Sequence, residues 1–490
     1  MPERRLVGID LGITSEHTVC VLRADGSQVC RRRCRPTPDS MAELERAALA
    51  GAPDGTRLEV VMEPTGPAWR PVAVYFVRRG HLVHRVSSAK AADLRRFLSR
   101  HAKSNSIDAM TLAKLAYLDP AGLIPLDLGD REQAALDRRV RACHRLTRLA
   151  GEHKTRLRDL VRQLLPDTPL EGALGQADLA ILERTGADPH RLARLGKARL
   201  ARLIAGASHG QLGELRALRW LDAAHSALEL FADHPALAFD DLAEEIKTEV
   251  RLLRATEAEL STHASARDLA YAQVDPEGLA RSLPGLGEVG APSLVAALGR
   301  PARFPSGRHA RSFSGLTPRS SETGETDRKG QPISKAGPSR LRTTLVLAAD
   351  HARRQDPQLA RVYYLQMTER GGCHAKAICV VAAKLAERAR AVLVRRLPYE
   401  LRDTDGRPVS AEQAKAIIAE QWTVPEEVRR RRRSRKTRGK APQQVGTRHV
   451  NASARGAATR RPSPPPILAP ELVQIKEVLS TIVQRTIVRP

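Results

Sequence analysis

Aromatic residues are scarce in this chain of 490 residues, since Phe, Trp and Tyr together make up only 3% of it. This scarcity argues against sheet-based domains that read single strands by stacking bases on aromatic side chains. No apolar run reaches the roughly 18 residues that a membrane-spanning helix needs, and the charged start has no long apolar core. We therefore expect neither a membrane span nor a secretory leader. The apolar residues are mostly Leu, Ala and Val, so helices should dominate.

The six cysteines are also too scattered to form the paired spacing of a zinc site. We interpret them as reduced, mostly buried thiols of a cytoplasmic protein.

Positive charge, by contrast, is abundant. The chain has 81 Lys and Arg residues against 55 Asp and Glu, which gives a formal net charge of +26. Such an excess indicates a polyanionic partner, with nucleic acid ahead of a membrane surface. At about 150 residues per domain, the length predicts two or three domains with linkers.

The first 120 residues alternate between segments typical of strands and of helices. A hairpin, a helix, a strand, a second helix and a last strand predict an α/β sheet. The expected strands are 6–12, 17–26, 58–66 and 81–86, and helices are expected at 71–79 and 103–117.

From residue 130 to 275 the apolar residues recur at three- and four-residue steps. This spacing predicts two long amphipathic helices with a helical insert between them. A coiled-coil dimerisation arm and a bundle that packs on itself both fit the pattern. The two stripes are Leu146, Leu149, Leu157, Leu160 and Leu164, and Leu242, Ile246, Val250, Leu253 and Leu260.

A third region begins near residue 280, with helices expected at 339–354 and 374–396. After Pro425 come five consecutive arginines, Arg429–Arg433, and then a mixture of Pro, Ala, Thr and Gly. We expect this tail to be largely disordered and to clamp phosphates without sequence preference. A tail with no special function is the alternative.

Three acids stand where strands end or a helix begins. Asp10 lies in the first strand, Glu63 ends a later apolar strand, and Asp108 lies just inside a helix. Acids at such positions can converge on one point, and their oxygens suit Mg²⁺. Taken singly, Glu63 could be an ordinary strand-end acid and Asp108 a helix-cap acid. Their order along the chain is that of ribonuclease-H-like nucleases.

A second set of residues lies in the third region. The segment 283–295 resembles a helix-hairpin-helix, in which Gly285 and Gly287 would let backbone N–H groups approach a DNA phosphate. An ordinary glycine-rich turn is the alternative.

The loop after it, 313–345, carries hydroxyls between cations. A hydroxyl there could attack a phosphodiester held by the cations, and a phosphate-binding loop without covalent chemistry fits the residues equally. The hydroxyl residues are Ser320, Ser321 and Thr323, and the cations expected to bind nucleic acid are Arg319, Arg328, Lys335 and Arg342.

These motifs together resemble the bridge-RNA-guided insertion-sequence transposases of the DEDD type, which are relatives of the Piv DNA invertase and have a C-terminal serine-recombinase-like domain. The resemblance covers roughly residues 5–120 and 280–395. Its matching motifs are Gly8–Asp10, Glu63–Gly66, Lys103–Ala109, Pro284–Gly287, Phe313–Arg319 and Ser334–Gly337.

Two positions depart from the family pattern. Asn105 replaces the first aspartate of the third acidic motif, so the implied metal ligands are Asp10, Glu63, Asn105 and Asp108. An amide oxygen can bind Mg²⁺, but the site loses one negative charge. Thr323 stands where the family has its nucleophilic serine, and its methyl group hinders in-line attack. Ser320 or Ser321 would be the alternative nucleophile, or the copy is impaired.

The resemblance implies a RuvC-like N-terminal domain and a transposase that cuts and rejoins DNA by Mg²⁺-assisted hydroxyl attack. It also implies a noncoding guide RNA and a homo-oligomer, a dimer or a tetramer. The alternatives are a RuvC-like nuclease that hydrolyses branched DNA and a catalytically impaired nucleic-acid-binding relative. The expected parts are a RuvC-like domain (1–125), a helical or coiled-coil region (126–275), a mostly helical transposase domain (276–400), and a linker with the disordered basic tail (401–490).

Overall fold

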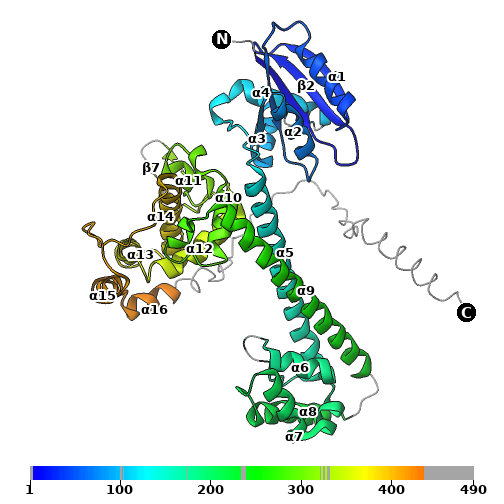
Figure 1. Ribbon diagram of the computed structural model, residues 1–490, viewed down its shortest axis with the longest axis vertical. Coiled ribbons are helices and arrows are strands. Elements are labelled where there is room, and N and C mark those ends of the chain that lie inside the picture. The colour runs from blue at the N-terminus through cyan, green and yellow to red at the C-terminus, as the bar shows by residue number, and fades with distance from the viewer. Residues whose placement is uncertain are drawn as a thin grey trace, which may run out of the picture. The chain divides into compact units, whose positions relative to one another are not determined.

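The computed structural model describes residues 4–99, 102, 104–170, 172, 174–232, 239–320, 322–323, 326–327 and 331–434. Of residues 322–323, 326–327 and 432–434 only the backbone is described. Most of these residues are helical, and one mixed sheet lies near the N-terminus (Figure 1), which confirms the expected composition of the fold. Among the described helices, none is both long enough and apolar enough to span a membrane.

The N-terminal sheet has five strands in the order β3-β2-β1-β4-β5. The first three pair as an antiparallel meander, and β4 and β5 run parallel to β1. Strand β3 was not expected from the sequence, because its three central arginines break the apolar alternation. The strands are β1 (Arg4–Asp10), β2 (His17–Arg23), β3 (Gln28–Cys34), β4 (Arg57–Met62) and β5 (Leu82–Arg85).

Helices cover both faces of this sheet. Because side chains alternate along a strand, Val7 and Ile9 of β1 face one apolar core, while Leu6 faces the other. The first core is closed by α1 (Pro38–Leu49) and α2 (Trp69–Arg78), and the second by α3 (Ser88–Leu98) and α4 (Asn105–Leu118).

Helix α4 packs unusually close to β1. A Cβ atom added to Gly8 would lie 2.0 Å from the carbonyl oxygen of Ala109 and 2.3 Å from the nitrogen of Ala113. Only glycine allows this contact between backbones. Gly8 therefore fixes the height of α4 above the sheet.

A buried charge cluster joins three strands beneath α4. The Glu59 carboxylate of β4 lies 3.0 Å from Nη1 of Arg4 and 3.2 Å from Nε2 of His84. The His84 imidazole holds the pKa of Glu59 below its usual value despite burial, and Arg4 adds to this effect. The cluster thus ties β4 to β1 and to β5.

Two long helices, α5 (Arg131–Leu164) and α9 (Phe239–Val274), pack side by side (Figure 1). A hydrogen bond between His153 and Glu249, at 2.5 Å, and the ion pair of Lys154 with Glu257, at 2.6 Å, join them. The expected pair of helices with an insert is therefore present, while a coiled-coil dimerisation arm stays a prediction. The insert consists of α6 (Gln176–Thr185), α7 (Pro189–Ala207) and α8 (Glu214–Phe231), which pack with the long helices around Trp220.

The C-terminal core also draws on both long helices. Leu136 and Val140 of α5 and Tyr271 of α9 pack among the later helices, so α5 and α9 contribute to two cores. The later elements are α10 (Gly290–Leu298), α11 (Gly307–Phe313), β6 (Glu322–Thr323), β7 (Thr326–Asp327), α12 (Ser339–Ala352), α13 (Pro357–Thr368) and α14 (His374–Arg395). Short 3₁₀ turns occupy Pro120–Gly122, Leu279–Ser282 and Pro301–Arg303.

The expected linker at residue 401 and the disordered arginine run need correction. Helix α15 (Ala411–Gln421) begins at a capping box between Ser410 and Gln413, and Ala414 and Val424 are buried. The five arginines lie within α16 (Glu426–Ser434), whose first turn supplies two acids. Local capping and a few apolar anchors thus extend the folded part to residue 434. The expected disorder beyond it lies outside the described residues.

The close approach at Gly8 makes a testable prediction. Replacement Gly8→Ala would force α4 away from β1 and lower the local stability of both elements by about 3 kcal/mol. Hydrogen exchange of the β1 and α4 amides measures this change.

The matched control is Gly151→Ala, inside α5, where an added Cβ meets nothing within 4 Å. This change should stabilise α5 by about 1 kcal/mol, because alanine favours a helix more than glycine does. Equal protection of β1 in the Gly8→Ala variant and the unchanged protein would refute the proposed role of Gly8.

Candidate active site

Asp10 and Glu63 lie next to each other at the carboxyl ends of two parallel strands. In the register of β1 and β4, Ile9 is opposite Met62, so the following residues are Asp10 and Glu63. Ile9 and Met62 face the core under α1 and α2, and alternation therefore turns the two acids toward the face that α4 covers. Both acids are partly buried.

Asp108 lies in the first turn of α4, above this same face. Ser104 caps the helix by accepting a hydrogen bond from the Ile107 N–H at 3.2 Å, so Asp108 is not the cap. Its Oδ1 instead accepts from Nη1 of Arg95 on α3 at 3.0 Å, and its side chain is 20% exposed. Asn105, the first residue of α4, is exposed.

The sheet and α4 thus bring the expected acids to one edge of the sheet, but the three side chains do not converge on one point. Among the residues that the structure describes, no three His, Cys, Asp or Glu side chains lie close enough together to hold a metal ion. Arg95, which sequence reasoning missed, engages Asp108. Nothing in the local sequence indicates this ion pair, because it depends on how α3 packs against α4.

The loop that carries the hydroxyls, residues 313–345, has two antiparallel segments at its base. The Ser334 N–H donates to the Thr317 carbonyl at 2.8 Å, and the Arg319 N–H donates to the Pro332 carbonyl at 3.0 Å. Further out, Thr323 pairs with Thr326 in the β6–β7 ladder. The backbone therefore places Thr323 in a short two-stranded ladder.

The residues expected around this hydroxyl have different surroundings. Ser320, Arg319 and Lys335 are exposed. Nη1 of Arg342 donates to the Gly337 carbonyl at 3.2 Å and the Ser314 carbonyl at 3.5 Å, and so holds the base of the loop. Ser321 and Arg328, like Lys103 of the N-terminal motif, lie outside the described residues.

The two glycines of the expected helix-hairpin-helix also differ. Gly285 has a φ of +76°, and an added Cβ would lie 2.2 Å from the Ala348 carbonyl oxygen. Its N–H already donates to Oε1 of Gln355 at 2.9 Å. Around Gly287, by contrast, an added Cβ meets nothing within 4 Å. Gly285 thus has a packing role, and the approach of a phosphate to either backbone stays a prediction.

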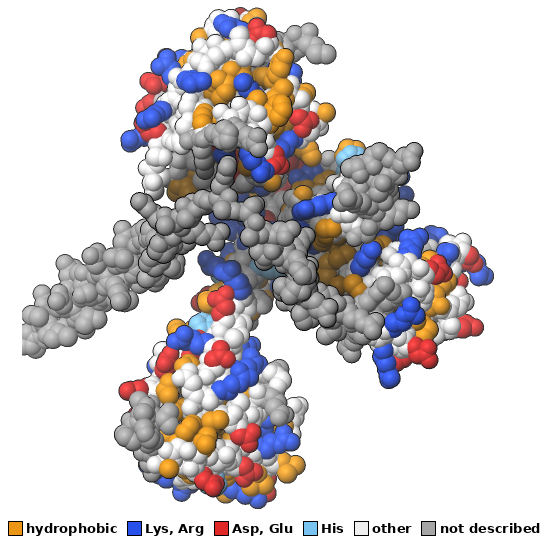
Figure 2. All heavy atoms as spheres, turned by 180° about the vertical axis from the view of Figure 1, so that it is seen from behind, with side chains coloured by type: hydrophobic (Ala, Val, Ile, Leu, Met, Phe, Trp, Pro, Cys, Tyr) orange, Lys and Arg blue, Asp and Glu red, His pale blue; other side chains and the backbone are white. Residues whose placement is uncertain are grey.

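On the face that Figure 2 shows, the described residues form no single basic patch beside these sites. Figure 2 shows Lys and Arg side chains dispersed over the visible face, among acidic and apolar side chains. Such a distribution suits contacts with phosphates at several places on the protein.

Two separate parts of the chain match known families. Residues 7–166, which include all three acids, match a family described as a transposase of the DEDD type. Residues 278–364, which include the β6–β7 ladder, match the family described as "Transposase IS116/IS110/IS902 family".

Individual proteins show the same similarity. The chain is 26% identical over 389 residues to an uncharacterized 43.6 kDa protein of insertion element IS110 from Streptomyces coelicolor, a match that covers 77% of this chain and 90% of that protein. It is also 27% identical over 124 residues to the pilin gene-inverting protein of Moraxella bovis, which covers 25% of this chain and 38% of that protein.

The contrast between the two glycines can be tested directly. Gly285→Ala should lower the stability of the C-terminal core by about 2 kcal/mol, because both its φ and its neighbours oppose a side chain. Gly287→Ala should leave stability unchanged within about 0.5 kcal/mol.

Chemical denaturation and DNA binding, measured in parallel, separate the two roles. If the Gly287 backbone contacts a phosphate, Gly287→Ala weakens DNA binding at unchanged stability. Normal binding by this variant would argue against that contact.

Proposed function

This chain belongs to the IS110 family of insertion-sequence transposases, enzymes that cut and rejoin DNA, and we propose that its acids and its C-terminal hydroxyl act together in that reaction. The observation that carries the proposal is the register of β1 and β4. It sets Asp10 beside Glu63 on the face where α4 presents Asp108. Carboxylates from separate segments at one edge of a sheet repel one another unless cations lie among them, and Arg95 already pairs with Asp108.

We propose Mg²⁺ as that cation, held by Asp10, Glu63 and Asp108 with the amide oxygen of Asn105. The donor set fits, because all four side chains offer the oxygen ligands that Mg²⁺ prefers. When bound, Mg²⁺ would neutralise charge that develops on the phosphate and the leaving oxygen. Arg95 would hold Asp108 in the unloaded site and release it when the site fills.

The hydroxyl of Thr323 is the proposed nucleophile. Its oxygen would form a bond to phosphorus while the bond from phosphorus to one deoxyribose oxygen breaks, and that oxygen would take up a proton to leave as an alcohol. The proton of Thr323 would pass to solvent or a nearby base. Attack by a deoxyribose hydroxyl of another strand would then reverse these changes and release Thr323. No hydrolysed end is formed.

The remaining parts of the proposal concern partners. A noncoding RNA would select the DNA by base pairing, and a homo-oligomer would combine the acids of one protomer with the β6–β7 ladder of another. The position of Thr323 in this ladder, apart from the acids in sequence, supports such sharing. We further propose a ribonuclease-H-like N-terminal fold and action in the cytoplasm.

A hydrolytic RuvC-like nuclease is the main competing function. It would use the acids but not the C-terminal hydroxyl, and would leave free DNA ends. A binding-only relative would use neither. Asn105 and Thr323 are the two residues that favour this last alternative.

Covalent capture of DNA tests the proposed nucleophile. The unchanged protein, incubated with a DNA end of its own element, should form an adduct that survives denaturing electrophoresis. Thr323→Ala should lower adduct formation by at least about 100-fold, because the attacking oxygen is lost. Thr323→Ser should retain the adduct and form it faster, because the methyl group is removed.

Ser320→Ala and Ser321→Ala are the matched controls and should keep the adduct. Loss of adduct in either control instead of Thr323→Ala would transfer the role to that serine. DNA cleavage without any adduct, unaffected by Thr323→Ala, would establish the hydrolytic alternative.

The metal site predicts a second, independent result. Asn105→Asp adds a carboxylate to the proposed ligands and should lower the Mg²⁺ concentration for half-maximal cleavage by about tenfold. Asp10→Asn and Glu63→Gln should abolish cleavage. Titration of cleavage with MgCl₂ measures all three.

Asp93→Asn is the control, because this exposed acid pairs with Arg96 away from the site. It should leave the Mg²⁺ dependence unchanged. Full cleavage by Asp10→Asn would contradict the metal site without affecting the proposed nucleophile.

A further inference from the structure

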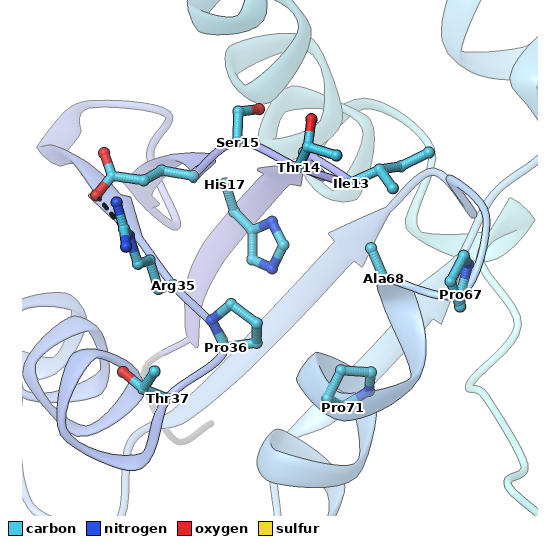
Figure 3. A pocket seen from close by; sticks show the side chains of 12 residues that line it. Ile13, Thr14, Ser15, His17, Arg35, Pro36, Thr37, Pro67, Ala68 and Pro71 are labelled. Carbon is cyan, nitrogen blue, oxygen red and sulfur yellow. Dashed lines mark hydrogen bonds and ion pairs between the residues drawn. The ribbon is translucent and has the colours of Figure 1, made fainter. Parts of the chain in front are cut away.

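A pocket opens beside the same end of the sheet, on the face covered by α1 and α2. Its volume is about 590 Å³, which lies within the range of ligand-binding pockets. It is formed by the turn after β1, the end of β3 and the start of α2, and its lining includes Thr14, His17, Pro36, Thr37, Ala68 and Pro71 (Figure 3).

His17 is the most unusual residue of this pocket. It is only 1% exposed, and neither ring nitrogen makes a hydrogen bond of good geometry, although the Gly12 backbone lies close by. Figure 3 shows the imidazole pointing into the space between Pro36 and Pro71. Buried polar atoms without partners are rare in proteins and costly. The imidazole thus borders the pocket with hydrogen-bonding capacity that the protein leaves largely unused, and a ligand would reach its nitrogens after a small shift of the lining.

The chemistry of these nitrogens restricts the ligand. Burial lowers the pKa of His17, although the nearby Gly12 backbone opposes this shift, so the ring is neutral near pH 7. A neutral imidazole has one donor nitrogen and one acceptor nitrogen. The other charged residues of the lining, Arg35 and Glu16, pair with each other at 3.4 Å. An uncharged ligand with both donors and acceptors fits better than a phosphate.

The walls favour a flat ligand. Pro36, Pro67 and Pro71 offer rigid apolar surfaces, and Thr14 and Thr37 lie at the margin of the pocket. A nucleobase combines an apolar ring face with donors and acceptors on its edge.

A strand of nucleic acid would have a charged path to this pocket. Arg31, Arg32 and Arg33 are exposed on β3, the edge strand that ends beside the rim. Arg32, opposite Val19, lies on the pocket's side of this edge, whereas Arg31 and Arg33 lie on the side that α4 covers. Arg31 bonds to the neutral side chains of Gln28 and Ser106 and also lies near the Cys20 thiol. In the described part of the chain no acid pairs with any of the three arginines. These cations are available to bind phosphates.

We propose that the pocket receives a single unstacked base of a DNA or RNA strand whose phosphates lie along β3. The proposal rests on the nucleic-acid function argued above, but it needs neither the metal site nor Thr323. DNA and RNA bases share the same ring face and edge groups, so the experiment below determines which of the two strands supplies the base.

Single-stranded oligonucleotides with one 2-aminopurine test the proposal on the full-length protein, one as DNA and one as RNA. Transfer of the base into the pocket should change its fluorescence for at least one of them. Thr37→Phe should block the mouth, because Thr37 is exposed and makes no capping bond that would be lost. We expect this variant to lose the fluorescence change and to bind about tenfold more weakly.

His17→Leu should abolish the fluorescence change without loss of stability, since it removes buried nitrogens without good hydrogen bonds, and His17→Gln should retain part of the signal. Ala50→Phe, at the opposite end of α1, is the matched control and should behave as the unchanged protein. Asp10→Asn should keep the signal, so that failure of the metal site is distinguished from failure of the pocket.

No fluorescence change with either oligonucleotide, or an undiminished change in both Thr37→Phe and His17→Leu, would overturn the proposal. A change with RNA alone or with DNA alone would support it and identify the strand that supplies the base.

Discussion

The contact between the backbones of α4 and β1 at Gly8 is the constraint on which the N-terminal part depends. Because no side chain separates the two, α4 lies low over the sheet and its first turn reaches the edge where β1 and β4 end. The β1–β4 register sets Asp10 beside Glu63, and this packing sets Asp108 on α4 above the same face. A buried contact between apolar elements thus determines where the charged groups of the candidate site meet.

The acids and Thr323, the two groups of residues in the proposed reaction, are held in place by different kinds of structure. The acids come from a sheet and a packed helix, which hold side chains with little freedom. Thr323 lies in a short two-stranded ladder. The base of the loop that carries it is held by a hydrogen bond from Arg342. A rigid acidic site and a nucleophile on a loop suit a reaction in which DNA strands must be attacked, moved and rejoined.

Much of this arrangement could be predicted from the sequence. Acids at strand ends and the start of the helix at residue 105 can be recognised from the neighbouring residues. Asp10 and Glu63 lie at strand ends and Asp108 in the first turn of a helix, as expected. Their roles stay predictions. The ion pair of Arg95 with Asp108 and the burial of His17 without good hydrogen bonds could not be predicted, because both depend on packing between distant segments. Strand β3 was missed because an edge strand with one exposed side needs no apolar alternation, and α15 because short capped helices resemble linkers in composition.

The arginines of β3 have one more consequence. An edge strand presents unpaired N–H and C=O groups that can template pairing with another chain, and this one belongs to a sheet with an apolar core on each face. Three adjacent exposed cations repel an identical edge and so oppose sheet-to-sheet aggregation. Neutralising them would therefore reduce the solubility of the protein as well as its contacts with phosphates.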